Sequence, residues 1–173
     1  MSNRRRGSLF STPRTKAYPR GPRFWVSAWL PVAVGIAVIM TESTAAFGAD
    51  RTTHPLRWLV QLLFGRLNDN TWDFIHLCIR KSGHFLGYGA LGLAWLRAWW
   101  MSFRGSRFLV DFLLALVGTA LVASCDEWHQ TFLPNRAGSP WDVLLDCCGA
   151  LAMQFIVYVF MRMFWPRLLA SRD

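Results

Sequence analysis

Four apolar runs, each about as long as a lipid bilayer is thick, dominate this sequence. They cover residues 24–41, 82–103, 108–124 and 141–164, and short polar segments separate the last three. Because the bilayer interior offers no water to unpaired backbone groups, runs of this length are predicted to cross it as helices. With 53% hydrophobic residues, the 173-residue chain is expected to form one membrane domain rather than a soluble one. The sequence therefore predicts an all-α, polytopic membrane bundle of four transmembrane helices.

A shorter amphipathic segment lies between the first two runs. Residues 55–64 carry apolar side chains at positions 56, 59, 60, 63 and 64, which is helical spacing, with polar Arg57 and Gln61 between them. A helix of this length reaches only about 15 Å, so it cannot cross a bilayer. We expect a short interfacial amphipathic helix lying on the membrane surface.

Basic residues are concentrated on one predicted side of the membrane. Thirteen of the nineteen Lys and Arg lie in residues 1–23, in the segment 97–107 or after residue 161. In a four-span arrangement these segments share one side, which the positive-inside rule assigns to the cytoplasm. Both termini are therefore expected to be cytoplasmic: residues 1–23 as a disordered basic tail and residues 166–173 as a second tail, flanking a membrane domain over 24–165. No nucleic-acid-binding motif accompanies the net charge of +9, so we expect no nucleic-acid partner.

The second apolar run begins with an unusual polar pattern. Lys81, His84 and Tyr88 fall within roughly 60° of one another on a helix, at a depth where polar groups require partners. Gly83 and Gly87 lie on a different side, where their G-x-x-x-G spacing predicts close approach of a neighbouring helix. The partners of the polar side must come from elsewhere in the chain.

The four-span arrangement places those partners at the same, extracytoplasmic end. The segments that gather there carry the following polar residues: Lys81, His84, Tyr88, Asp126, Glu127, His129, Gln130, Arg136, Asp142 and Asp146. Several have simpler explanations, because Lys81 can extend to the membrane surface and Asp142 can cap a helix that starts at Ser139-Pro140. Asp146, one turn further into the apolar run, is expected to be paired or functional.

The order of these motifs resembles a known family of bacterial membrane proteins. Lys81-x-x-His84-Phe85-x-x-Tyr88, then Glu127-x-x-Gln130, then Arg136, then Ser139-x-x-Asp142 is similar to the pattern of the VanZ family. The resemblance covers residues 42–155. It departs from the family pattern where Arg80 replaces a frequent acidic residue, Asn135 a frequent glycine and Asp146 the usual asparagine. The resemblance implies the bacterial cytoplasmic membrane and a role at the cell envelope, since the family is named after a protein giving low-level teicoplanin resistance. It implies no established reaction.

Three hypotheses for the polar cluster follow. In the first, the cluster binds or modulates a polar lipid headgroup or an envelope glycan, with Lys81, Tyr88, Gln130, Arg136 and Asp142 as binding residues. In the second, an intramembrane enzyme acts on an envelope lipid by acid–base chemistry, with His84, Glu127 and Asp146 as catalytic residues. In the third, the polar groups only hold the helices together. A metal variant of the enzyme would use His84, Glu127 and Asp142, but their spacing matches no known metal motif, so we assign no metal and no cofactor.

Overall fold

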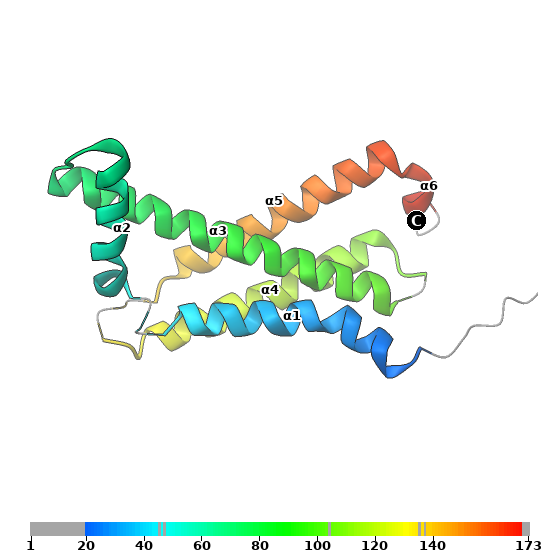
Figure 1. Ribbon diagram of the computed structural model, residues 1–173. Coiled ribbons are helices and arrows are strands. Elements are labelled where there is room, and N and C mark those ends of the chain that lie inside the picture. Colours follow the sequence, from blue (N-terminus) through cyan, green and yellow to red (C-terminus); the bar gives the residue numbers. More distant parts are fainter. Residues whose placement is uncertain are drawn as a thin grey trace, which may run out of the picture.

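The computed structural model describes residues 20–44, 46, 48–103, 105–134, 136 and 138–170. These residues form helices and no strand: α1 (Pro22–Glu42), α2 (Ala49–Phe64), α3 (Asp69–Ser102), α4 (Phe108–Gln130), α5 (Pro140–Phe164) and α6 (Pro166–Ala170). Figure 1 shows α1, α3, α4 and α5 running alongside one another, with α2 across one end and α6 at the other. The expected all-α class is confirmed. Most of the predicted basic tail, residues 1–19, lies outside the described residues.

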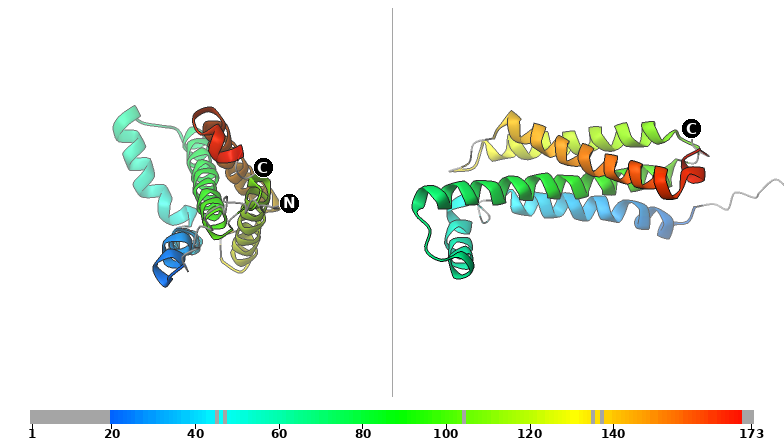
Figure 2. Two further views of the ribbon diagram at one scale, coloured as in Figure 1. Left: turned by 90° about the vertical axis from the view of Figure 1, so that its right-hand side faces the viewer. Right: turned by 90° about the horizontal axis from the view of Figure 1, so that it is seen from above.

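The long helix α3 holds the bundle together. It packs against α1, α4 and α5, and its contact with α5 is the most extensive between any two helices (Figure 2). We expected a helix beginning near Ser82, but α3 already begins at Asp69. The Asn68 side chain starts it, since its Oδ1 accepts a 2.8 Å hydrogen bond from the backbone N–H of Thr71. The charged turns 69–81 therefore continue into the apolar run without a break.

Three of the described helices are long and apolar enough to cross a membrane, namely α1, α4 and α5. Their outward faces expose large apolar side chains at every fourth residue, as at Val26, Leu30, Val34 and Val38 of α1 and Leu109, Leu113, Val117 and Leu121 of α4. Small residues are common in the interior, where Ala28, Ala98, Ala115, Ala123 and Ala150 have no exposed surface, beside larger buried side chains such as Tyr88 and Leu91. Large apolar side chains on the outward faces, with small residues at the helix contacts, are the pattern of helices packed in lipid.

Glycines set the closest approach of α3 to α5. A Cβ added to Gly149 would lie 2.1 Å from the Phe85 carbonyl oxygen, and one added to Gly89 would lie 2.8 Å from Met153 Cγ. The prediction of a helix contact at Gly83 and Gly87 is wrong, since a Cβ at either position would meet nothing within 4 Å. The G-x-x-x-G spacing marks an open face of α3, and the packing glycines lie on the face that Gly89 occupies.

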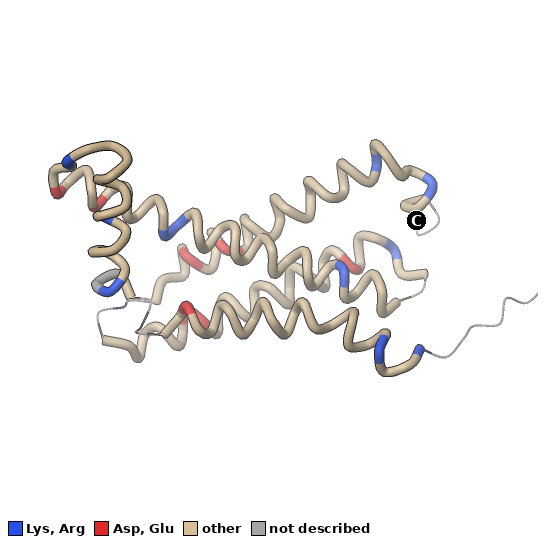
Figure 3. The backbone as a smooth tube through the Cα atoms, viewed as in Figure 1, with Lys and Arg blue, Asp and Glu red and all other residues tan. Residues whose placement is uncertain are grey.

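Charges divide along the length of the bundle. Figure 3 shows acidic residues gathered in the half nearer α2, whereas the opposite end, where the described chain begins and ends, carries mainly Lys and Arg. Residues 166–170 of the expected C-terminal tail form α6, and Leu169 is buried in a cluster with Leu96, Phe108 and Ala115. The end of the described chain is therefore packed onto the bundle.

His76 connects α2 to the bundle. Its Nε2 lies 3.2 Å from Thr52 Oγ1, its Nδ1 lies 3.3 Å from Thr53 Oγ1, and its ring stacks on Trp72 with centroids 5.3 Å apart. Burial lowers the pKa of His76, the Arg80 charge lowers it further, and Asp73 partly opposes them. Docked α2 thus favours the neutral imidazole.

The attachment of α2 is therefore expected to weaken in acid. A lowered pKa means that the undocked histidine binds more protons, so this contribution to docking is complete above about pH 6.5 and is lost as the pH falls through the lowered pKa. Amide hydrogen exchange, corrected for the intrinsic effect of pH, should show α2 losing protection between about pH 7 and 5. In His76→Gln this pH dependence should disappear. Unchanged protection in the wild-type chain would contradict the expectation.

Candidate functional site

Three helices and a loop bring the predicted polar residues to the end of the bundle where α2 lies. Lys81, His84 and Tyr88 come from α3, Asp126, Glu127 and Gln130 from α4, Asp142 and Asp146 from α5, and Arg136 from the loop before α5. The structure also shows which of these side chains contact one another.

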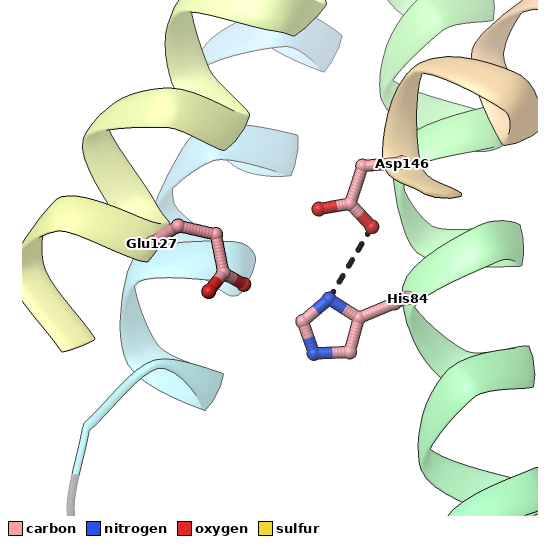
Figure 4. Close-up of side chains that lie close together, drawn as sticks. All are labelled: His84, Glu127 and Asp146. Atoms are coloured by element: carbon pink, nitrogen blue, oxygen red, sulfur yellow. Dashed lines mark ion pairs between the residues drawn. The ribbon is translucent and has the colours of Figure 1, made fainter. Parts of the chain in front are cut away.

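His84, Glu127 and Asp146 face one another between α3, α4 and α5 (Figure 4). His84 Nδ1 lies 3.3 Å from Asp146 Oδ1, and one donor atom from each of the three residues lies within 4.8 Å of the other two. Asp146 is fully buried and Glu127 is 4% exposed. His84 Nδ1, both Asp146 oxygens and Glu127 Oε1 make no hydrogen bond with the described residues. These three residues, predicted as a catalytic set, thus form a buried cluster with unused bonding capacity.

Glu127 also helps to start α5. Ser139 is the N-cap of α5, and its Oγ accepts a 3.2 Å hydrogen bond from the backbone N–H of Trp141. In a capping box, the carboxylate three residues later would accept from the N-cap N–H. Here Glu127 Oε2 takes that bond from the Ser139 N–H, at 2.8 Å. One oxygen of Glu127 therefore fixes α5 against α4, and its other oxygen faces the cluster.

Asp142 is released from capping and pairs with Lys81. The two side chains form an ion pair between α5 and α3, with Lys81 41% and Asp142 21% exposed. Partial exposure screens such a pair, so its contribution to stability is small. The metal variant suggested from sequence is not supported at Asp142, because the third member of the cluster is Asp146.

Tyr88 and Gln130 converge on a residue that the sequence analysis left without a role. Tyr88 donates its hydroxyl to Asp126 Oδ2 at 2.9 Å, and Gln130 Nε2 donates to the same oxygen at 3.2 Å. Asp126 is only 2% exposed. The four-residue separation of Asp126 and Gln130 on one helix face was the available signal for this network.

Arg136 binds the end of α1. Its Nη2 donates to the carbonyl oxygens of Glu42 at 3.1 Å and Thr44 at 3.3 Å, which satisfies acceptors left free where that helix stops. Burial lowers the pKa of Arg136, and the nearby Arg80 charge lowers it further, against the opposing charges of Asp126 and Glu127. Two guanidinium groups thus lie near each other at this end of the bundle.

A cleft of about 190 Å³ opens beside these groups. Its walls come from α1 to α4 and include the apolar side chains of Ile39 and Leu56. A second cleft, of about 150 Å³, extends toward Lys81 and Asp142. The two share four lining residues, which are Arg80, His84, Gln130 and Arg136. Gly83 and Gly87 also line the larger cleft, so the missing side chains leave space there.

All eight predicted site residues thus lie at one end of the bundle. Lys81, His84, Tyr88, Gln130, Arg136 and Asp142 line one or both clefts, whereas Glu127 and Asp146 lie behind His84 in the buried cluster. Sequence analysis assigned no role to Asp126, which accepts hydrogen bonds from Tyr88 and Gln130, or to Thr52, which lines the larger cleft from α2.

Apolar helices around a buried polar cluster with an adjoining cleft are the fold and site of a helical membrane protein. The family comparison is consistent with that class. The chain belongs to the VanZ/LLP1 family, whose model matches residues 26–162 and so includes every predicted site residue. The predicted resemblance is confirmed. No curated protein and no solved structure matches the chain.

Proposed function

We propose that this VanZ/LLP1 family protein binds the anionic headgroup of an envelope lipid in the cleft beside Arg80 and Arg136. The observation that carries the proposal is the composition of that cleft, which places two guanidinium groups beside the apolar side chains of Ile39 and Leu56. Glu42 and Asp126 also line the cleft, and Asp126 accepts hydrogen bonds from Tyr88 and Gln130. Arg80 has no hydrogen-bond or ion-pair partner among the described residues and is half-buried. A bound anion would relieve the mutual repulsion of the two cations and accept their hydrogen bonds.

The size of the cleft favours a headgroup over an envelope glycan. Sites that enclose a drug-sized ligand measure roughly 300–1,000 Å³. At about 190 Å³, the larger cleft takes a phosphate-bearing headgroup and leaves acyl chains outside. The smaller cleft, with Lys81 and Asp142 in its wall, offers polar contacts to a headgroup substituent.

The proposal includes a four-span topology in the bacterial cytoplasmic membrane. Residues 82–102 of α3 are the fourth span. Its hydropathy is lowered by glycines, by His84 and Tyr88, and by Arg97, whose Nη1 donates to the carbonyl oxygen of Ser27 in α1. In this topology α2 lies on the outer surface of the cytoplasmic membrane, with its exposed Trp58, Leu62 and Phe64 in the membrane–water interface. Both termini are cytoplasmic, so the cleft opens toward the outer leaflet, the side from which a role in glycopeptide resistance would be exerted.

Lipid binding tests the proposal. We expect the purified chain in detergent to bind short-chain phosphatidylglycerol and to bind phosphatidylcholine much more weakly. Arg80→Gln should weaken phosphatidylglycerol binding roughly tenfold, because a hydrogen bond to a charged group is worth about 1.5–3 kcal/mol. Arg136→Gln should weaken it further. Native mass spectrometry measures the bound fraction.

Arg57→Gln is the matched control. Arg57 also lies at the α2 end, but it pairs with Asp69 at 2.7 Å and lines neither cleft. Its substitution should leave binding unchanged. Equal binding of phosphatidylglycerol by wild type and Arg80→Gln would contradict the proposal, as would equal binding of both lipids.

An intramembrane enzyme is the second candidate, and the cluster of His84, Glu127 and Asp146 favours it. A carboxylate beside His84 Nδ1 can orient the ring for proton transfer. Turnover of the bound lipid that His84→Ala abolishes while binding persists would select this candidate. The purely structural alternative has less support, because a network built only for stability would leave few buried oxygens without partners.

A further inference from the structure

The buried cluster contains nitrogen and oxygen atoms that have no hydrogen-bond partner among the described residues and could therefore bind a ligand. His84, Glu127 and Asp146 come from three different helices, and their donor atoms lie within 4.8 Å of one another. Asp146 has no exposed surface, and neither of its oxygens is hydrogen-bonded to the described residues. His84 Nδ1 and Asp146 Oδ1 lie 3.3 Å apart, which is an ion pair when the imidazole is protonated, although the geometry is not that of a hydrogen bond. Figure 4 shows both carboxylates and the imidazole turned toward a common space.

Two of the neighbouring cations are engaged elsewhere. Lys81 pairs with Asp142, and Arg136 donates to backbone carbonyls of α1. A protonated His84, whose Nδ1 lies 3.3 Å from Asp146 Oδ1, would balance only one of the two carboxylates. The second would be costly to bury, because charge in a low-dielectric interior requires compensation. A divalent ion would neutralise both at once and would use the free electron pairs.

We propose that His84, Glu127 and Asp146 bind a divalent transition-metal ion. One imidazole nitrogen with two carboxylate oxygens suits Zn²⁺ or Mn²⁺, whereas the absence of thiolate from the set disfavours Cu(I). Donor atoms around a tetrahedral Zn²⁺ lie about 3.4 Å apart, so small side-chain rotations would close the set. Because His84 also lines the cleft, the ion would lie next to the proposed headgroup and could act on its phosphate as a Lewis acid.

The metal content of the purified chain tests this proposal without any lipid. The purified full-length chain is stripped with EDTA, incubated with Zn²⁺ or Mn²⁺ and freed of excess ion. We expect about one ion per chain by elemental mass spectrometry, and a rise in the unfolding midpoint of a few degrees. Glu127→Gln and Asp146→Asn should each reduce bound metal to near zero. Both amides keep the side-chain shape, and the amide oxygen of the Glu127→Gln variant still accepts from the Ser139 N–H.

Asp73→Asn is the matched control, since Asp73 is an exposed carboxylate in the first turns of α3 that lies outside the donor set and outside both clefts, and it should bind metal like the wild type. The proposal is overturned if the stripped chain takes up no stoichiometric ion. It is also overturned if the Glu127→Gln/Asp146→Asn double variant binds as much as the wild type, since the ion would then lie elsewhere. Because no lipid is present, metal binding can succeed where headgroup binding fails, and the reverse.

Discussion

Gly149→Ala is expected to destabilise the bundle more than most single substitutions. The added Cβ would lie 2.1 Å from the carbonyl oxygen of Phe85, which is a backbone atom and cannot rotate away. The helices α3 and α5 would have to separate along their extensive contact. Overpacking in a dense interior costs roughly 1–3 kcal/mol or more, and a backbone clash belongs at the upper end, at about 3 kcal/mol.

Gly83→Ala is the matched control, because an added Cβ at Gly83 has nothing within 4 Å. Alanine is the better helix former by about 1 kcal/mol, so this variant should be as stable as the wild type or slightly more so. Thermal unfolding in detergent, followed by tryptophan fluorescence, compares the two. If both variants melt with the wild type, α3 and α5 do not approach as closely as described. If both unfold early, the face at Gly83 is a packed one.

The contrast between Gly83 and Gly149 also shows where sequence analysis failed. G-x-x-x-G spacing identifies a face that can admit a neighbour, but it does not tell which face of α3 turns toward α5. That choice depends on the rotation of each helix about its axis, which small residues on α5 help to decide: Gly149 and Ala150 meet the face that Gly89 and Gly92 share. The sequence of α3 alone does not show which of its faces packs against α5.

Helix existence was better predicted than helix extent. The apolar runs 24–41, 108–124 and 141–164 lie within α1, α4 and α5, since an uninterrupted apolar run admits few alternatives to a helix. The first turns of α3 were missed because Asp69, Asp73, Arg80 and Lys81 interrupt the apolar residues there, so the segment does not read as part of an apolar run. Continuity with the following run and the Asn68 cap make them helical.

The gathering of the site followed from topology, but its pairings did not. Antiparallel helices with short loops bring the head of α3, the end of α4 and the start of α5 together, whatever the side chains. Whether Glu127 reaches both His84 and the start of α5, and whether Asp142 or Asp146 faces the imidazole of His84, depends on shifts of a single helical turn. One turn is about 5.4 Å, which exceeds the separations that define the cluster.

Tyr88→Phe is expected to cost about 1.5 kcal/mol of stability, and Asp126→Ala about twice that. Interhelical hydrogen bonds in membranes average only about 0.6 kcal/mol and reach about 1.7 kcal/mol. The Tyr88 bond belongs near the maximum because it is 2.9 Å long and its acceptor is a buried carboxyl group. Asp126→Ala removes the acceptor of both Tyr88 and Gln130, so two buried donors lose their partner.

A double-mutant cycle separates this bond from general damage to the interior. The Tyr88→Phe/Asp126→Ala variant should lose less stability than the two single losses added together, with a difference of about 1.5 kcal/mol, since the shared bond is removed once. Tyr158→Phe supplies the control for loss of a phenolic hydroxyl, because Tyr158 is 37% exposed on α5 and should tolerate the change. Strict additivity would mean that Tyr88 and Asp126 stabilise the bundle separately, and that Asp126 does not position the tyrosine along the cleft wall.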